Sequence, residues 1–139
     1  QVGLRMISDH PILGVGLNNF PEVFGKYYWT TPGISRALKL RSASHNIYIG
    51  TISELGLIGF TILAIMIYSI IKSGWIARSN LKRIGDYQLM VITEGIILSF
   101  VGLLISGFFG DVLYKKYLWL PLILIEVVRN LSTKFSSVS

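Results

Sequence analysis

Three apolar runs, two long and one short, are separated by polar segments and dominate the pattern of this chain. The run over 47–71 contains no Lys, Arg or Asp and a single Glu, and a second run covers 89–109. At about 1.5 Å of rise per helical residue, each of these runs can cross a bilayer core of roughly 30 Å. The third run is short, and its helix reaches a usable length only if it begins near residue 112, so that the flanking lysines extend toward the head groups. The pattern predicts transmembrane helices over 47–71, 89–109 and 112–128.

The longest polar segment, 8–46, precedes the first of these helices. Prolines and glycines interrupt it repeatedly, so no long helix fits there. Asn18 or Asn19 can cap a short helix that ends near Trp29. The aromatic residues of that helix suit an element lying at the level of lipid head groups.

The remaining segments complete the predicted organisation. Residues 1–7 look like the end of a preceding helix, residues 72–88 are predicted to form a loop, and residues 129–139 a polar tail. Small residues recur along the second run at Gly95, Ser99, Gly102 and Ser106. That stripe is typical of closely packed membrane helices.

Composition supports an all-α, polytopic membrane helical bundle. The 139 residues are 52% hydrophobic and 14% charged, and cysteine is absent, which excludes disulfides and thiolate chemistry. The net charge of +6 is scattered between apolar runs, which favours anionic lipids over nucleic acid as partners. We expect the chain to be the C-terminal part of a larger membrane protein.

The most informative candidate for chemistry is Ser44-His45-Asn46, at the start of the first apolar run. A histidine near its ordinary pKa can accept a proton from a hydroxyl group efficiently at neutral pH. The alternative is that Ser44 or Asn46 caps the helix while His45 has no chemical role. Both interpretations remain open at this point.

Three cations, Arg36, Lys39 and Arg41, lie shortly before His45. Arginine's planar fork suits a diphosphate, so these residues are candidates to hold one. The alternative is a solvated basic loop that touches lipid phosphates.

Two carboxylates, Glu54 and Glu94, fall inside the predicted spans, where a charge is costly. Nine helical steps of about 100° place Glu54 on the face opposite His45 and about 13 Å along the axis, so a direct pair is not expected. We expect each carboxylate to form hydrogen bonds within the bundle or to other helices. No cluster of residues has the spacing of metal ligands, and no metal or other cofactor is expected.

Two segments resemble the family of bacterial O-antigen ligases and polymerases. Residues 6–20, MISDHPILGVGLNNF, are similar to that family's "hPlfGvGlgnF" segment, and residues 44–59, SHNIYIGTISELGLIG, to its "HNxyLxxlxExGxxG" segment. The two occur in order, with a basic stretch between them. The later apolar runs match the family in hydropathy only.

This resemblance implies a metal-independent enzyme of the bacterial inner membrane, with 8–46 on the periplasmic side. It implies transfer of a glycan from an undecaprenyl-diphosphate carrier to a hydroxyl of an acceptor glycolipid or glycan, in surface polysaccharide biosynthesis such as that of lipopolysaccharide. His45 would activate the acceptor, with Asn46 and Glu54 in support. The residues that would hold the diphosphate are Arg36, Arg41, Lys39 and Arg5.

The resemblance does not distinguish a ligase, a polymerase and a protein O-glycosyltransferase. We expect residues 1–139 alone to be inactive, because part of the site would lie in preceding helices. A different class also fits the pattern: part of a lipid-linked-sugar flippase or ion-coupled transporter, in which Glu54 and Glu94 relay protons.

Overall fold

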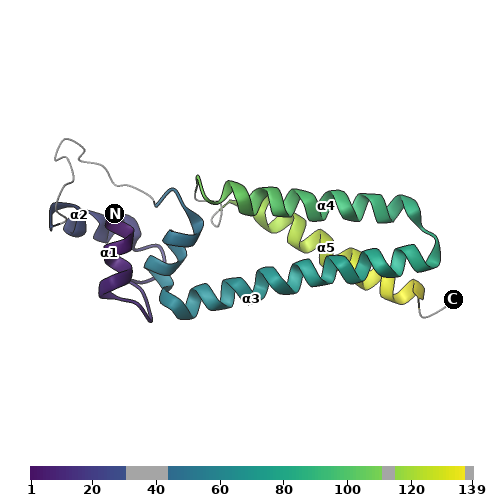
Figure 1. Cartoon of the computed structure of the whole chain (residues 1–139), viewed down its shortest axis with the longest axis horizontal. Helices are drawn as coiled ribbons and strands as arrows, with labels where there is room; N and C mark the ends of the chain where they lie inside the picture. The colour runs from purple at the N-terminus through teal and green to yellow at the C-terminus, as the bar shows by residue number, and fades with distance from the viewer. Residues whose placement is uncertain (31–43, 111–114, 137–139) are drawn as a thin grey trace. The chain divides into compact units, whose positions relative to one another are not determined.

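The structure, a computed structural model, describes residues 1–30, 44–110 and 115–136, and the regular elements in these ranges are helices joined by turns and loops. Within these ranges there is no strand, which confirms the all-α prediction. The helices, shown in Figure 1, are α1 (Val2–Asp9), α2 (Phe20–Thr30), α3 (Ile47–Ile84), α4 (Tyr87–Ser106) and α5 (Lys116–Ser136). By length and composition, α3 and α4 are able to cross a membrane.

The described residues form two compact units. Unit 1 takes its residues from 1–64 and 107–113, and unit 2 from 65–106 and 114–139. Helix α3 contributes its first part to unit 1 and its second part to unit 2.

In unit 1, α1 packs against α2 (Figure 1). Val2 and Met6 of α1 are buried together with Phe20, Tyr27 and Tyr28 of α2. The aromatic residues expected at the head groups therefore include three that form a protein core. The sequence pattern did not distinguish these two uses, because a buried aromatic stripe and an interfacial one have the same spacing.

Helix α3 is not the continuous helix predicted over 47–71, because its backbone breaks at Gly56 (φ 64°, ψ −166°). Only glycine adopts this conformation at low cost. Past the break, Leu57 donates its N–H to the carbonyl oxygen of Pro11 at 2.8 Å, and Ile58 donates to that of Ile12 at 3.4 Å. The loop after α1 thus supplies acceptors that the broken helix lacks.

The same loop also supplies donors to the carbonyl groups before the break. Val15 N–H donates to the oxygen of Ser53 at 2.9 Å, and Gly16 N–H donates to that of Glu54 at 2.8 Å. A Cβ atom on Gly14 would lie only 2.3 Å from the backbone of Glu54, so this close approach requires glycine. Glycines 14 and 16, both with positive φ, therefore shape a tight backbone contact.

In unit 2, the polar segment predicted as a loop over 72–88 is mostly helix, and the prediction was wrong. Helix α3 continues to Ile84 and turns at Gly85, and Asp86 caps α4 by accepting the N–H of Leu89 at 3.0 Å. The physical reason is amphipathicity: Lys72, Lys82 and Arg83 are exposed, while Ala77 and Leu81 are buried. Counting charges alone had placed the helix end too early.

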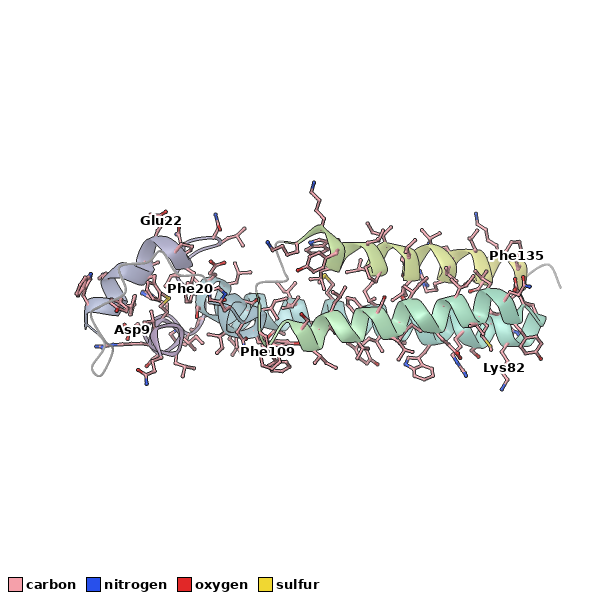
Figure 2. The ribbon with its side chains drawn as sticks, turned by 90° about the horizontal axis from the view of Figure 1, so that it is seen from above. Asp9, Phe20, Glu22, Lys82, Phe109 and Phe135 are labelled. Atoms are coloured by element: carbon pink, nitrogen blue, oxygen red, sulfur yellow. The ribbon has the colours of Figure 1, made fainter. Side chains whose placement is uncertain are left out.

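The last helix also differs from its prediction. Helix α5 begins at Lys116 and continues to Ser136, whereas 129–139 was expected to be a polar tail. Val128 of α5 packs with the buried residues of α3, and Ser132 is fully buried, so tertiary contacts extend the helix past its apolar run. Figure 2 shows Lys82 of α3 and Phe135 of α5 at the same end of unit 2. Helix α5 is not among the helices with the length and hydropathy of a span.

The stripe of small residues on α4 is not packed closely against another described helix, although its spacing had predicted such packing. The stripe consists of Gly95, Ser99, Gly102 and Ser106. All four of its residues are exposed, and a Cβ atom on Gly95 or Gly102 would meet nothing within 4 Å. Instead α4 buries Thr93 and Phe100, which lie on another face of the helix.

Candidate functional site

The Ser44-His45-Asn46 segment forms a tight turn that starts α3. Asn46 is the N-cap: its Oδ1 atom accepts the N–H of Tyr48 at 3.0 Å and that of Ile49 at 2.9 Å. Ser44 donates its hydroxyl to the carbonyl oxygen of Asn46 at 2.9 Å. The capping that sequence analysis proposed is therefore real, and Asn46 performs it. His45 is left with an exposed side chain and a left-handed backbone (φ 48°).

A second set of contacts ties this turn to the segment that follows α4, also within unit 1. Asn46 donates from Nδ2 to the carbonyl oxygen of Phe108 at 3.1 Å, and the N–H of Ile47 donates to that of Gly107 at 2.8 Å. The rings of Tyr48 and Phe108 lie 4.5 Å apart, centroid to centroid. The three residues that follow His45 are thus held by Gly107 and Phe108.

His45 lies on the wall of a cavity of about 350 Å³ within unit 1. One wall is aromatic and comes from residues four apart on α2. The other walls come from the start of α1 and the start of α3. The lining residues are Gln1, Val2, Gly3, Leu4, Phe20, Phe24, Tyr28, Ser44, His45 and Ile49. An apolar cavity with a few polar groups at one side is a common form of binding site for organic molecules.

The aromatic wall is internally ordered. The rings of Phe20 and Phe24 have centroids 6.1 Å apart, and those of Phe24 and Tyr28 are stacked at 5.5 Å. Such spacing is the usual range for interacting aromatic pairs. The wall therefore behaves as one packed surface whose position depends on where α2 is held.

Glu54 holds the N-terminus of α2. Its Oε2 accepts the N–H of Asn18 at 3.0 Å and its Oε1 accepts the N–H of Phe20 at 3.1 Å, and the residue is only 6% exposed. A carboxylate at this end also complements the helix dipole. Asn19, one of the predicted caps, instead donates its side-chain amide to the carbonyl oxygen of Val15. The cap of α2 thus comes from a residue far away in sequence, which local cap rules do not detect.

Arg5 lies near Tyr27 and Asp9 and is not among the residues that line the cavity. Burial raises the pKa of the Tyr27 hydroxyl above its usual value of 10.0, and the Asp9 carboxylate, which accepts a hydrogen bond from it, raises the pKa further. Arg5 opposes this shift through its positive charge. These groups join α1 to α2.

Glu94 of α4 forms an ion pair with Arg78 of α3 in unit 2. The Arg78 guanidinium also lies 5.7 Å from the centroid of the Trp75 ring, within the range of a cation–π contact. Both carboxylates were expected to form hydrogen bonds within the helical bundle or to other helices. Glu94 does so with Arg78 of α3, whereas Glu54 accepts its bonds from residues of the polar segment 8–46.

The structure therefore brings His45, Asn46 and Glu54 into one unit, with direct roles for Asn46 and Glu54 in shaping the site. Arg36, Lys39 and Arg41 lie outside the described residues. Sequence reasoning missed the contribution of Phe24 and Tyr28 to the cavity, although their spacing from Phe20 was a readable signal of one helix face.

Comparison with known proteins identified no relative: no protein-family model, curated protein or solved structure matches this chain.

Proposed function

We propose that this chain is part of a metal-independent membrane glycosyltransferase of the O-antigen ligase and polymerase type. The reaction would transfer a glycan from an undecaprenyl-diphosphate carrier to an acceptor hydroxyl. The observation that supports it best is the exposed His45 imidazole on the wall of a cavity, at the turn that begins a helix able to cross a membrane.

In this proposal the His45 imidazole accepts the proton of the acceptor hydroxyl as its oxygen attacks the anomeric carbon of the sugar. The bond between that carbon and the diphosphate oxygen breaks, and the diphosphate leaves with the electron pair. A positioned base contributes roughly 10²–10⁴ in rate. Stabilisation of the departing diphosphate is assigned to Arg36 and Arg41 by their place in the sequence, and it is often the larger contribution.

The local geometry gives His45 the freedom that this role needs. Asn46 caps α3 and Ser44 closes the turn, so neither task falls on His45. Its left-handed backbone is uncommon for a residue other than glycine, and such conformations cluster at functional sites. The proposal places 8–46 on the outer face of a bacterial inner membrane.

The decisive test is glycan transfer by His45→Asn in membranes that contain the intact protein. Asparagine tolerates the left-handed backbone but cannot act as the base, so we expect a loss of roughly 10²–10⁴-fold. His10→Asn is the matched control, because His10 is exposed at the end of α1 and does not line the cavity. An unchanged rate for His45→Asn would refute the proposal.

The transporter alternative has less support. Its two proposed relay groups are already engaged: Glu54 accepts two backbone amides, and Glu94 pairs with Arg78. A transporter would lose function on neutralisation of either carboxylate while tolerating His45→Asn, so the same variant separates the two classes.

A further inference from the structure

We propose that Glu54 is the positioning residue of this site. Its carboxylate fixes the N-terminus of α2 on α3, and thereby fixes the aromatic wall of the cavity relative to His45. As a role in glycan transfer, this inference rests on the function proposed above.

The first argument is the chemistry of the contact. The two oxygen atoms of Glu54 accept the N–H groups of Asn18 and Phe20 at 3.0 and 3.1 Å in a nearly water-free setting. Two donors need two acceptor oxygens, and a carboxylate offers both. A glutamine would offer one oxygen and direct its NH₂ group at the second N–H. Hydrogen bonds to a charged acceptor are also stronger than neutral ones.

The second argument is that the backbone of Glu54 holds the same segment as its side chain. Its carbonyl oxygen accepts the N–H of Gly16 at 2.8 Å, next to the bond from Val15 to Ser53. A Cβ atom on Gly56 would lie 2.1 Å from the carbonyl oxygen of Ile12, so the main chains of the two segments lie in direct contact. Residues 15–20 are therefore held along α3 by main chain and side chain together.

The third argument is the path from this contact to the cavity. Phe20, whose N–H binds Glu54, is the first residue of α2 and already lines the cavity. Phe24 and Tyr28 follow on the same face. His45 lines that cavity from the N-terminal turn of α3, the helix that carries Glu54. Releasing the N-terminus of α2 would move the wall and leave the His45 turn in place.

A distance measurement between two spin labels tests the positioning directly. Residues 1–139 contain no cysteine, so with any cysteine elsewhere in the intact protein replaced by serine, labels can be placed at Gly25→Cys on α2 and Ile62→Cys on α3, both in unit 1. A side chain at Gly25 would meet nothing within 4 Å, and Ile62 is 63% exposed. We expect a narrow distance distribution in the intact protein and a broadened or shifted one in Glu54→Gln.

Glu94→Gln is the matched control, because it neutralises the other intramembrane carboxylate in unit 2. It should leave the distribution unchanged. Glu54→Asp keeps the charge but shortens the side chain, so it should also broaden the distribution, and it provides the same test if Glu54→Gln does not accumulate. An unchanged distribution in a Glu54 variant would overturn the proposal.

Activity measurements separate positioning from proton transfer. If Glu54 only positions α2, Glu54→Gln should lower kcat/KM by roughly ten- to a hundredfold, the cost of a misplaced site, and leave the pH profile of kcat/KM unshifted. A shifted profile would assign Glu54 a role in proton transfer and contradict this inference. Because the distance measurement does not depend on catalysis, it stands even if His45→Asn refutes the proposed function.

Discussion

In unit 1 the loop after α1 is joined to α3 largely through the backbone, whereas in unit 2 the helices are joined through side chains. The loop after α1 exchanges four main-chain hydrogen bonds with the broken turn of α3, and a buried carboxylate caps α2. In unit 2, regular helices meet through Ala77, Leu81 and Val128 and through the pair of Arg78 with Glu94. In unit 1 the contact between the loop and α3 requires glycine at particular positions. In unit 2 the helices pack through the apolar faces that the hydrophobic pattern creates. The candidate site lies in the unit that tolerates less change.

The largest expected effect comes from glycines in the two units. Gly56→Ala should lower the free energy of unfolding by about 3 kcal/mol, because alanine is strained at φ 64° and its Cβ would collide with the backbone of Ile12. Gly95→Ala should raise the free energy of unfolding by up to about 1 kcal/mol. The added Cβ would meet nothing within 4 Å, and alanine favours a helix over glycine. The measurement is Tm of the intact protein in detergent. Similar Tm values for the two variants would contradict the contrast between the units.

A smaller change in the free energy of unfolding is expected from the two helix caps, Asn46 on α3 and Asp86 on α4. Asn46→Ala should cost about 2 kcal/mol, because it removes both the cap of α3 and the bond to Phe108. Asp86→Ala should cost about 1 kcal/mol, because among the described contacts the Asp86 side chain caps α4 and forms no hydrogen bond comparable to the one from Asn46 to Phe108. Asn46→Asp keeps the capping oxygen but loses the donor, so it should cost about 1 kcal/mol, the contribution of the bond to Phe108. Chemical denaturation of each variant measures these differences, and equal losses would show that the bond to Phe108 contributes nothing.

The smallest effect concerns the contact of α1 with α2 at alkaline pH. The pKa of Tyr27 is raised in the folded protein, so the neutral phenol contributes stability that is complete below its ordinary pKa of 10.0. That contribution is lost as the pH rises through the folded-state pKa. Tyr27→Phe should remove this dependence. Asp9→Asn should reduce it only in part, because burial is the larger cause. Phenolate absorbance followed against pH measures the shift, and a Tyr27 contribution that titrates at 10.0 or below would contradict it.

Comparing the predicted and observed bounds of the helices shows which features the local sequence pattern predicts. The apolar run after residue 47 predicted a helix there, and Asn46 was correctly identified as a possible cap. The end of α3 and the extent of α5 were misjudged, because both helices continue through polar sequence whose buried face is set by contacts with other helices. Residues 111–114, where a start for the third helix was predicted, lie outside the described residues.

Part of the candidate site was likewise predicted from the sequence, and part was visible only in the structure. His45 was found from the sequence because a titratable side chain next to an apolar run is visible without any partner. The role of Glu54 as the cap of α2 was not, because its two donors lie 36 and 34 residues away. The rules for helix caps examine neighbouring residues and contain no information about such distant pairs.

The sequence by itself determined the helical class, two of the three helices predicted to cross a membrane, and the residues with reactive side chains, because periodicity, hydropathy and chemical type are local properties. Only the tertiary structure decided that α3 breaks at Gly56, that the loop after α1 satisfies the exposed backbone groups, and that Glu54 faces α2. The physical reason is that a buried N–H or carbonyl group must find a partner, and which distant segment provides it depends on how the chain packs.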